Sequence, residues 1–151
     1  VSTMGRTIVH PRPAGAGQAA KICNNMVLGV SMIAVSEAFG LADRLGLDRQ
    51  KLFDIASQSS GHCWSLTNYC PVPGPVPDSP ANRDYEAGFT AEMMLKDLRL
   101  AQDASNASGA ATPLGAEAAA LYALYCNAGN QKQDFSGIFK MLAANHRDKA
   151  R

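Results

Sequence analysis

The run from Gly15 to Leu45 contains no proline and is filled mostly by Ala, Leu, Val, Met and Ile. As a helix, at about 1.5 Å per residue, it would extend roughly 45 Å. It carries no charge between Lys21 and Glu37, and its apolar residues lie all around the helix instead of on one stripe. A helix that is apolar all round is typically buried. We therefore predict a long central helix with other elements packed around it.

A membrane span is the alternative for such a helix, and two features argue against it. The uncharged stretch is shorter than the ~20 apolar residues that a bilayer requires. Polar side chains also interrupt it, namely those of Asn24, Asn25, Ser31 and Ser36. We interpret the run as the core helix of a globular domain.

The rest of the chain predicts shorter helices and no sheet. A second helix follows Gly46, a residue suited to a helix C-cap, and is expected to bury Leu52, Phe53, Ile55 and Ala56. A fourth begins at Thr90, with a favourable Glu92–Lys96 pair four residues apart. The expected fold is all-α, a long central helix packed by four or five shorter ones, which include a short aromatic element at residues 62–70, a helix from Thr112-Pro113 to Gly129 and a last one from Ser136 to Asn145.

Composition limits the class of protein. A chain of 151 residues has the length of one domain. Its net charge of +1 argues against nucleic acid or an anionic membrane surface as the main partner. The four cysteines form no C-x-x-C pair, which indicates reduced thiols in an intracellular protein, although an even count leaves disulfides open.

Lys21 is placed oddly for a structural residue. It lies in the second turn of the long helix, where the macrodipole disfavours a cation by about 0.3–1 kcal/mol. Asn24 and Asn25 fall on the same side, so three polar groups meet at the head of an apolar helix. A lysine whose charged form is disfavoured suits general acid–base chemistry. The structural alternative is a lysine that extends to solvent while the two amides satisfy nearby backbone.

Two other motifs imitate known sites without completing them. Gly15-x-Gly17-x-x-Ala20 after a strand-like Thr7-Ile8-Val9 imitates a dinucleotide-binding fingerprint, but the acidic residue at the right distance, Glu37, lies inside a helix. His62 beside Cys63 and Cys70 suggests zinc, yet no fourth ligand or paired spacing appears, and we predict no metal. The same segment, on residue types alone, favours a packed turn of helix that buries Trp64.

The ends of the chain and one loop divide it further. Residues 1–13 predict the remnant of a preceding nucleotide-binding domain and its linker, 14–146 a helical substrate and dimerisation domain, and 147–151 a polar tail. The proline-rich stretch from Pro71 to about Gly88 predicts a long loop, either a functional cover or disordered.

Several segments together carry a family resemblance over nearly the whole chain. Gly15-x-Gly17-x-x-x-Lys21-x-x-Asn24-Asn25 resembles the C-terminal domain of the β-hydroxyacid dehydrogenases, relatives of 6-phosphogluconate dehydrogenase. The segments Ser59–Ser65, Asn68–Gly74 and Gly88-Phe89 with Met94–Leu98 are most similar to the 3-hydroxyisobutyrate branch of that family. The stretch His10–Pro13 departs from the family, and the family's glycine-rich nucleotide fold does not occur in these residues.

The resemblance implies a role for each matching residue. Lys21 would be the general acid and base, and Asn25, with Asn24 beside it, would orient the substrate. Trp64 and Phe89 would line its acyl pocket. On the cofactor side, Lys96 would reach NAD and Asp97 would support the site.

Two functions of different class follow from these observations. The first is half of an NAD-dependent dehydrogenase that oxidises 3-hydroxyisobutyrate or another short 3-hydroxy acid, inactive alone, cytoplasmic in a bacterium or in the mitochondrial matrix of a eukaryote. The second is a non-catalytic helical oligomerisation module. In both, the apolar first helix predicts a homodimer or homotetramer. A strand and Gly-x-Gly-x-x-Gly upstream of Val1 would favour the first function, and an initiator methionine there would favour the second.

Overall fold

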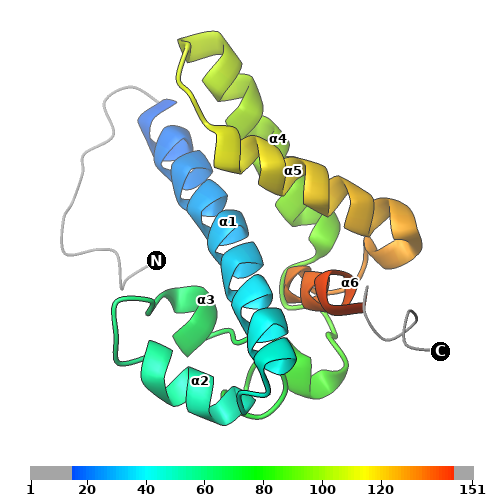
Figure 1. Cartoon of the computed structure of the whole chain (residues 1–151). Coiled ribbons are helices and arrows are strands. Elements are labelled where there is room, and N and C mark those ends of the chain that lie inside the picture. Colours follow the sequence, from blue (N-terminus) through cyan, green and yellow to red (C-terminus); the bar gives the residue numbers. More distant parts are fainter. Residues whose placement is uncertain (1–14, 145–151) are drawn as a thin grey trace.

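The computed structural model describes residues 15–144, and within them the fold is all-α, as predicted. Helix α1 (Gly15–Leu45) crosses the middle of the molecule. Figure 1 shows α4 (Ala91–Ser108) and α5 (Pro113–Tyr125) on one side of it, and α2 (Arg49–Ala56) with the short α3 (Trp64–Thr67) on the other. Helix α6 (Ile138–Ala144) packs against the C-terminal half of α1. The strand-like Thr7–Val9 and the tail 147–151 lie outside the described residues.

The helix ends follow local sequence signals. Gly46 takes a φ of 72° after α1, a left-handed conformation that glycine adopts without strain. The side chain of Asp48 accepts a hydrogen bond from the Lys51 amide and caps α2. Thr90 caps α4 in the same way, through the amide of Met93. Pro113 occupies the first turn of α5, as predicted.

Two apolar clusters hold α1 in place. The first joins its middle to α4, α5 and the segment before α6, around Met32, Leu98 and Tyr122. The second joins its C-terminal half to α3 and the following loop, around Phe39 and Val72. The central helix is therefore anchored along its length by residues from at least four other elements.

Two predictions about packing and one about an ion pair are wrong. Helix α1 is not buried all round, because Val27, Leu41 and Leu45 are exposed. Ile55 is also exposed, since the short α2 packs only through Leu52, Phe53 and Ala56.

The third concerns charge. Glu92 pairs with Lys132, 40 residues away, with 2.7 Å between Nζ and Oε1, and not with Lys96 on its own helix. The predicted i, i+4 partner of Glu92, Lys96, is thus replaced by Lys132 from a distant segment.

The proline-rich loop is ordered. Its segment Pro80–Arg83 forms a 3₁₀ helix. Val72 and Tyr85 are buried, and the Tyr85 hydroxyl donates to the Pro71 carbonyl at 2.7 Å. The loop thus forms one wall of the domain.

Helix α1 is long and apolar enough to cross a membrane by length and composition, as core helices of soluble proteins also are. It packs against all five other α-helices of the described chain, α2 to α6. Asn25, which bonds a carboxylate of α4, sits on the packed side of the helix.

Candidate active site

The polar residues predicted at the head of α1 come together with one residue of α4. The Asn25 side-chain amide donates to Oδ2 of Asp97 at 2.8 Å, across 72 residues of sequence. The Asn24 amide in turn donates to Oδ1 of Asn25 at 3.2 Å. Asp97 is only 7% exposed. The buried carboxylate therefore fixes the orientation of the Asn25 amide, and Asn25 fixes that of Asn24.

This contact depends on a close approach of α1 to α4. A Cβ atom added at Gly29 would lie 3.0 Å from Sδ of Met94 and 3.1 Å from a methyl of Leu98. Gly29 follows Asn25 by one helical turn, and Leu98 follows Asp97 by one residue. The missing side chain at Gly29 thus brings the two backbones near enough for the amide to reach the carboxylate.

Lys21 lies one turn before Asn25, on the same side of α1, about 6 Å along the helix axis. Its side chain is exposed. Within residues 15–144 it makes no ion pair. The ammonium is free to meet a small molecule brought against this end of the domain.

Lys96 is exposed, although its neighbour Asp97 is buried. Successive residues on a helix point about 100° apart. Asp97 consequently faces α1 while Lys96 faces outward. The structure thus places Lys96 where it can reach a molecule outside the domain.

A row of aromatic rings forms a second group. Trp64 stacks on Tyr69 with 5.1 Å between ring centroids, and Tyr69 stacks on Phe135 at 5.3 Å. Phe89 meets Phe135 edge to face at 5.6 Å. Trp64 is 52% exposed, so the prediction that it is buried is wrong. The row joins Trp64 and Phe89, both predicted to line a pocket, through Tyr69 and Phe135, which sequence reasoning missed.

Asp134 organises this aromatic row. Its carboxylate is fully buried, and Oδ1 accepts hydrogen bonds from the Tyr69 hydroxyl at 2.7 Å and from the Gly88 and Phe89 amides at 3.0 Å each. Oδ2 accepts from the amide and hydroxyl of Ser136. Burial, together with the bond to Asp134, raises the pKa of Tyr69 well above its ordinary value of 10. Tyr69 therefore acts as a neutral donor.

Sequence reasoning missed Asp134 because Asp134-Phe135-Ser136 reads as an ordinary cap. It does cap the short 3₁₀ helix Phe135–Gly137. The signal that could have found it is an acidic residue directly before the mostly apolar run Phe135–Leu142, because a carboxylate buried beside such a run needs several donors.

Helix α1 is linked to the aromatic row as well. The hydroxyls of Ser31 and Ser65 lie 2.8 Å apart, which ties α1 to α3 next to Trp64. Both serines are partly or fully buried. The same helix thus carries Lys21 and the amides near its start and holds the aromatic element further along.

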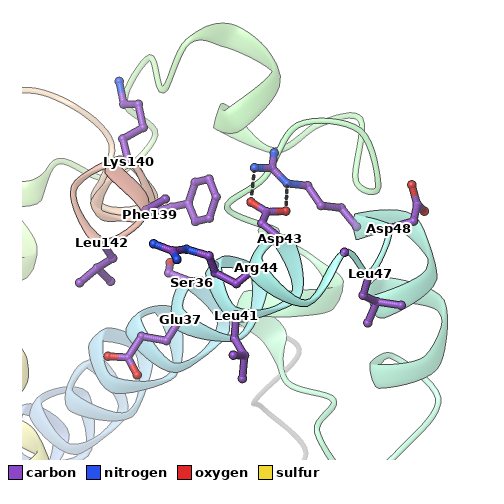
Figure 2. Close-up of a pocket in the computed structure, with 14 residues that line it drawn as sticks. Ser36, Glu37, Leu41, Asp43, Arg44, Leu47, Asp48, Phe139, Lys140 and Leu142 are labelled. Atoms are coloured by element: carbon purple, nitrogen blue, oxygen red, sulfur yellow. Dashed lines mark hydrogen bonds and ion pairs between the residues drawn. The ribbon is translucent and has the colours of Figure 1, made fainter. Parts of the chain in front are cut away.

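The predicted residues do not line the large hollow of the domain. That hollow, about 1400 Å³, lies between the C-terminal end of α1 and α6. Figure 2 shows it with the Asp43–Arg49 ion pair, Phe139 and Lys140. The group around Lys21 lies instead on an open surface. Residues 15–144 contain no group of three or more His, Cys, Asp or Glu placed to hold a metal, and all four cysteines are free thiols.

Comparison with known proteins gives one consistent family. Residues 15–142 match the family model described as the NAD-binding domain of NADP-dependent 3-hydroxyisobutyrate dehydrogenase. The chain is 52% identical over 141 residues to a probable 3-hydroxyisobutyrate dehydrogenase of Mycobacterium tuberculosis, covering 93% of this chain and 48% of that protein. It is 47% identical over 139 residues to an NAD-dependent L-serine dehydrogenase of Pseudomonas aeruginosa, covering 92% of this chain and 47% of that protein.

A solved structure supports the same relation. The fold matches that of the M. tuberculosis 3-hydroxyisobutyrate dehydrogenase, described with L-serine, at a TM-score of 0.83 and 54% identity. The match covers 85% of this chain and 44% of that one. The chain thus spans about half the length of the relatives it matches. With its long central helix, its Lys-x-x-Asn-Asn head and these matches, the chain belongs to the NAD-binding domain family of the 3-hydroxyisobutyrate dehydrogenases.

Proposed function

We propose that this chain is the C-terminal domain of an NAD-dependent dehydrogenase that oxidises 3-hydroxyisobutyrate to methylmalonate semialdehyde, a step of valine catabolism. The observation that carries the proposal is the fixed Asn24–Asn25–Asp97 group one helical turn from an exposed Lys21. Family membership supports the reaction class. Because the chain spans about half of its relatives, the domain alone is expected to be inactive.

In this proposal Lys21 takes the proton of the substrate hydroxyl. It does so as the neutral amine, which becomes the ammonium when it accepts the proton. Its position fits because the side chain is exposed and makes no ion pair in the described part of the chain, so a substrate can reach it. Asn25 orients the substrate hydroxyl or carboxylate, and Asp97 prevents its amide from rotating. The proton leaves to solvent, which this open surface admits.

The aromatic row suits the apolar part of such a substrate. Trp64 and Phe89 present ring surface at the two ends of the row. Moving a methyl group from water onto an apolar ring surface is favourable by roughly 0.8 kcal/mol per buried carbon. The row therefore supports selection for a short, branched hydroxy acid.

The residues of this chain can supply only part of a dinucleotide-binding site. Lys96 is exposed and can meet an outside molecule, while Asp97 is buried behind it and holds Asn25. Residues 15–144 lack a glycine-rich phosphate loop after a strand. The cofactor, which accepts the hydride in this reaction class, would be held mainly by the other half of the protein. Lys96 would contribute a cation to it, and the choice between NAD and NADP rests with that other half.

A second substrate has a specific observation in its favour. One relative is named an NAD-dependent L-serine dehydrogenase, and the matching solved structure is described with L-serine. Serine is also a short 3-hydroxy acid. A panel of 3-hydroxyisobutyrate, L-serine and 3-hydroxypropionate on the complete protein separates these readings, and a kcat/KM that favours serine would replace the first by the second. The occurrence of bacterial and mitochondrial relatives is consistent with a cytoplasmic or matrix enzyme.

The test of the chemistry is Lys21→Ala in the complete protein. Loss of a general acid and base is expected to lower kcat by about 10²–10⁴-fold while cofactor binding stays near wild type. Lys51, also an exposed lysine but on α2, provides the matched control, and Lys51→Ala should leave kcat unchanged. Lys21→Arg keeps the charge but holds its proton near neutral pH. If the arginine variant retains most of its turnover, Lys21 transfers no proton.

A further inference from the structure

The two oxygens of the Asp134 carboxylate bond to different parts of the chain. Oδ2 accepts hydrogen bonds from the amide and the hydroxyl of Ser136, two residues away. Oδ1 accepts from the Tyr69 hydroxyl and from the Gly88 and Phe89 amides, which come from segments 45 to 65 residues earlier. Oδ2 therefore fixes the carboxylate on its own segment, and Oδ1 joins two distant segments at one point.

The backbone of Phe89 is held at both of its polar groups. Its amide donates to Oδ1 of Asp134 at 3.0 Å, and its carbonyl accepts from the amide of Phe135 at 2.8 Å. The amide of Asp134 donates to the Tyr85 carbonyl at 2.9 Å, which ties the same segment to the proline-rich loop. Residues 134 and 135 thus fix the backbone position from which the Phe89 ring extends.

The ring of Tyr69 is held by stacking and by its hydroxyl. It stacks on both Trp64 and Phe135, with interplanar angles of 21° and 29°. Stacking sets the plane of a ring but not its direction within that plane, which the hydrogen bond to Asp134 sets. A Cβ atom at Gly88 would lie 2.8 Å from the Tyr69 hydroxyl oxygen. The absence of a side chain at residue 88 therefore leaves room for this bond.

One oxygen atom thus relates the two ends of the aromatic row to each other. Trp64 stacks on Tyr69, and both Tyr69 and the Phe89 backbone bond to Oδ1 of Asp134. In the proposed function Trp64 and Phe89 present the apolar surface that receives the methyl group of the substrate. One methyl group in an apolar pocket accounts for about 10–200-fold discrimination between substrates. That discrimination depends on how closely the two rings surround the methyl group.

We propose that Asp134 is a positioning residue that determines the preference of the site for a hydroxy acid bearing a methyl group. Its side chain is fully buried and does not touch the substrate. It acts through Tyr69, which supports Trp64, and through the backbone of Phe89. The inference rests on the proposed function, because the methyl group is that of 3-hydroxyisobutyrate. Loss of the Oδ1 contacts is expected to lower the discrimination and to leave the proton transfer at Lys21 in place.

The first test is a competition in the complete protein between 3-hydroxyisobutyrate and 3-hydroxypropionate, which differ by one methyl group. The readout is the ratio of the two kcat/KM values, because an unfolded fraction lowers both values equally and leaves the ratio unchanged. Wild type is expected to prefer 3-hydroxyisobutyrate by at least about 10-fold, and Asp134→Asn should bring the ratio to within about threefold of unity.

Tyr69→Phe and Ser136→Ala form a matched pair, because each removes one hydroxyl donor from the same carboxylate. Tyr69→Phe releases Oδ1 from one distant segment and keeps a ring that can stack on Trp64. Ser136→Ala changes only the contacts of Oδ2. The first variant should lower the methyl preference, and the second should keep the wild-type ratio. If Asp134→Asn does not fold, Tyr69→Phe takes its place in both tests.

The second test needs no activity. Trp64 is the single tryptophan of the 151-residue chain, so its fluorescence reports one end of the row. Acrylamide should quench it more strongly in Asp134→Asn than in wild type, because a Tyr69 ring released from Oδ1 no longer covers one face of the indole. Quenching in Ser136→Ala should match wild type. Circular dichroism of the same samples confirms that each variant is folded.

The following results would overturn the inference. A wild-type protein without methyl preference, or an equal preference in wild type, Asp134→Asn and Tyr69→Phe, means that the carboxylate only stabilises the fold. A loss of preference in Ser136→Ala as large as in Tyr69→Phe means that Oδ1 has no special part. A wild-type protein that oxidises no 3-hydroxy acid refutes the proposed function instead. Unchanged acrylamide quenching in Asp134→Asn then shows, without any activity, that Asp134 does not position the row.

Discussion

The Tyr69 hydroxyl donates a 2.7 Å hydrogen bond to Oδ1 of the fully buried Asp134, 65 residues later in the chain. The same oxygen accepts the Gly88 and Phe89 amides. A single atom therefore holds three segments together.

Gly88→Ala should destabilise the domain by about 1–3 kcal/mol, the usual cost of leaving a buried polar group unpaired. A Cβ atom at residue 88 would lie 2.8 Å from the Tyr69 hydroxyl oxygen and displace it from Asp134. Urea unfolding measures the change. Gly40→Ala is the control, because a Cβ there meets nothing within 4 Å inside α1, and it should stabilise by up to about 1 kcal/mol. Equal effects at both positions would contradict the steric explanation.

Asp134→Asn should cost more, at least about 3 kcal/mol. The carboxylate accepts five hydrogen bonds, and an amide replaces one accepting oxygen by a donor that faces other donors. Asp103→Asn, at an exposed position on α4, should leave the unfolding midpoint within experimental scatter. If Asp134→Asn unfolds at the wild-type urea concentration, the network contributes nothing to stability.

Stability should fall as the solution becomes alkaline. Burial raises the pKa of the Cys70 thiol from 9.0 to about 11 and that of Tyr85 from 10.0 to about 12. Between pH 9 and 11 the unfolded chain releases the Cys70 proton while the folded chain keeps it. This contribution is therefore fully present below pH 9 and is lost as pH rises through 11.

The measurement is the urea midpoint across that range. Cys70→Ala should reduce the part of the decline that starts near pH 9 and leave the rest, which Cys126, whose pKa burial also raises, and the buried tyrosines carry. An unchanged slope in the variant would assign the whole decline to Cys126 and the tyrosines.

The isolated chain should bind NAD weakly and oxidise no hydroxy acid. Lys96 is a single exposed cation, and one exposed ionic contact is worth about 1 kcal/mol or less. Isothermal titration calorimetry of the chain with NAD checks this. Binding at micromolar concentration would mean that these residues hold the dinucleotide themselves.

The helices could be predicted because their signals are local. Asp48, Thr90 and Pro113 mark three starts, and Gly46 marks one end, each by a mechanism that acts within a few residues. The sequence also shows the polar cluster of Lys21, Asn24 and Asn25, because polar residues near the start of an otherwise apolar helix are visible without knowledge of the tertiary structure.

What could not be predicted depends on contacts between distant segments. The Asn25–Asp97 bond follows from the close approach at Gly29, which no periodicity reveals. Trp64 stays half exposed because Tyr69 stacks on one ring face only. Asp134 looks like a cap in the sequence, and its other three donors come from 45 to 65 residues away.

Because the Asp134 carboxylate already accepts five hydrogen bonds in the folded chain, the aromatic row is fixed before any ligand binds. A molecule that binds against Phe89 contacts rings that are already fixed in the folded protein, so the protein loses little conformational entropy on binding. Selectivity at such a rigid surface comes from steric exclusion of ligands of the wrong shape, not from rearrangement of the protein around each ligand. A new preference would have to arise by replacing a ring, because the hydrogen bonds of Asp134 hold Tyr69 and the Gly88-Phe89 backbone in place.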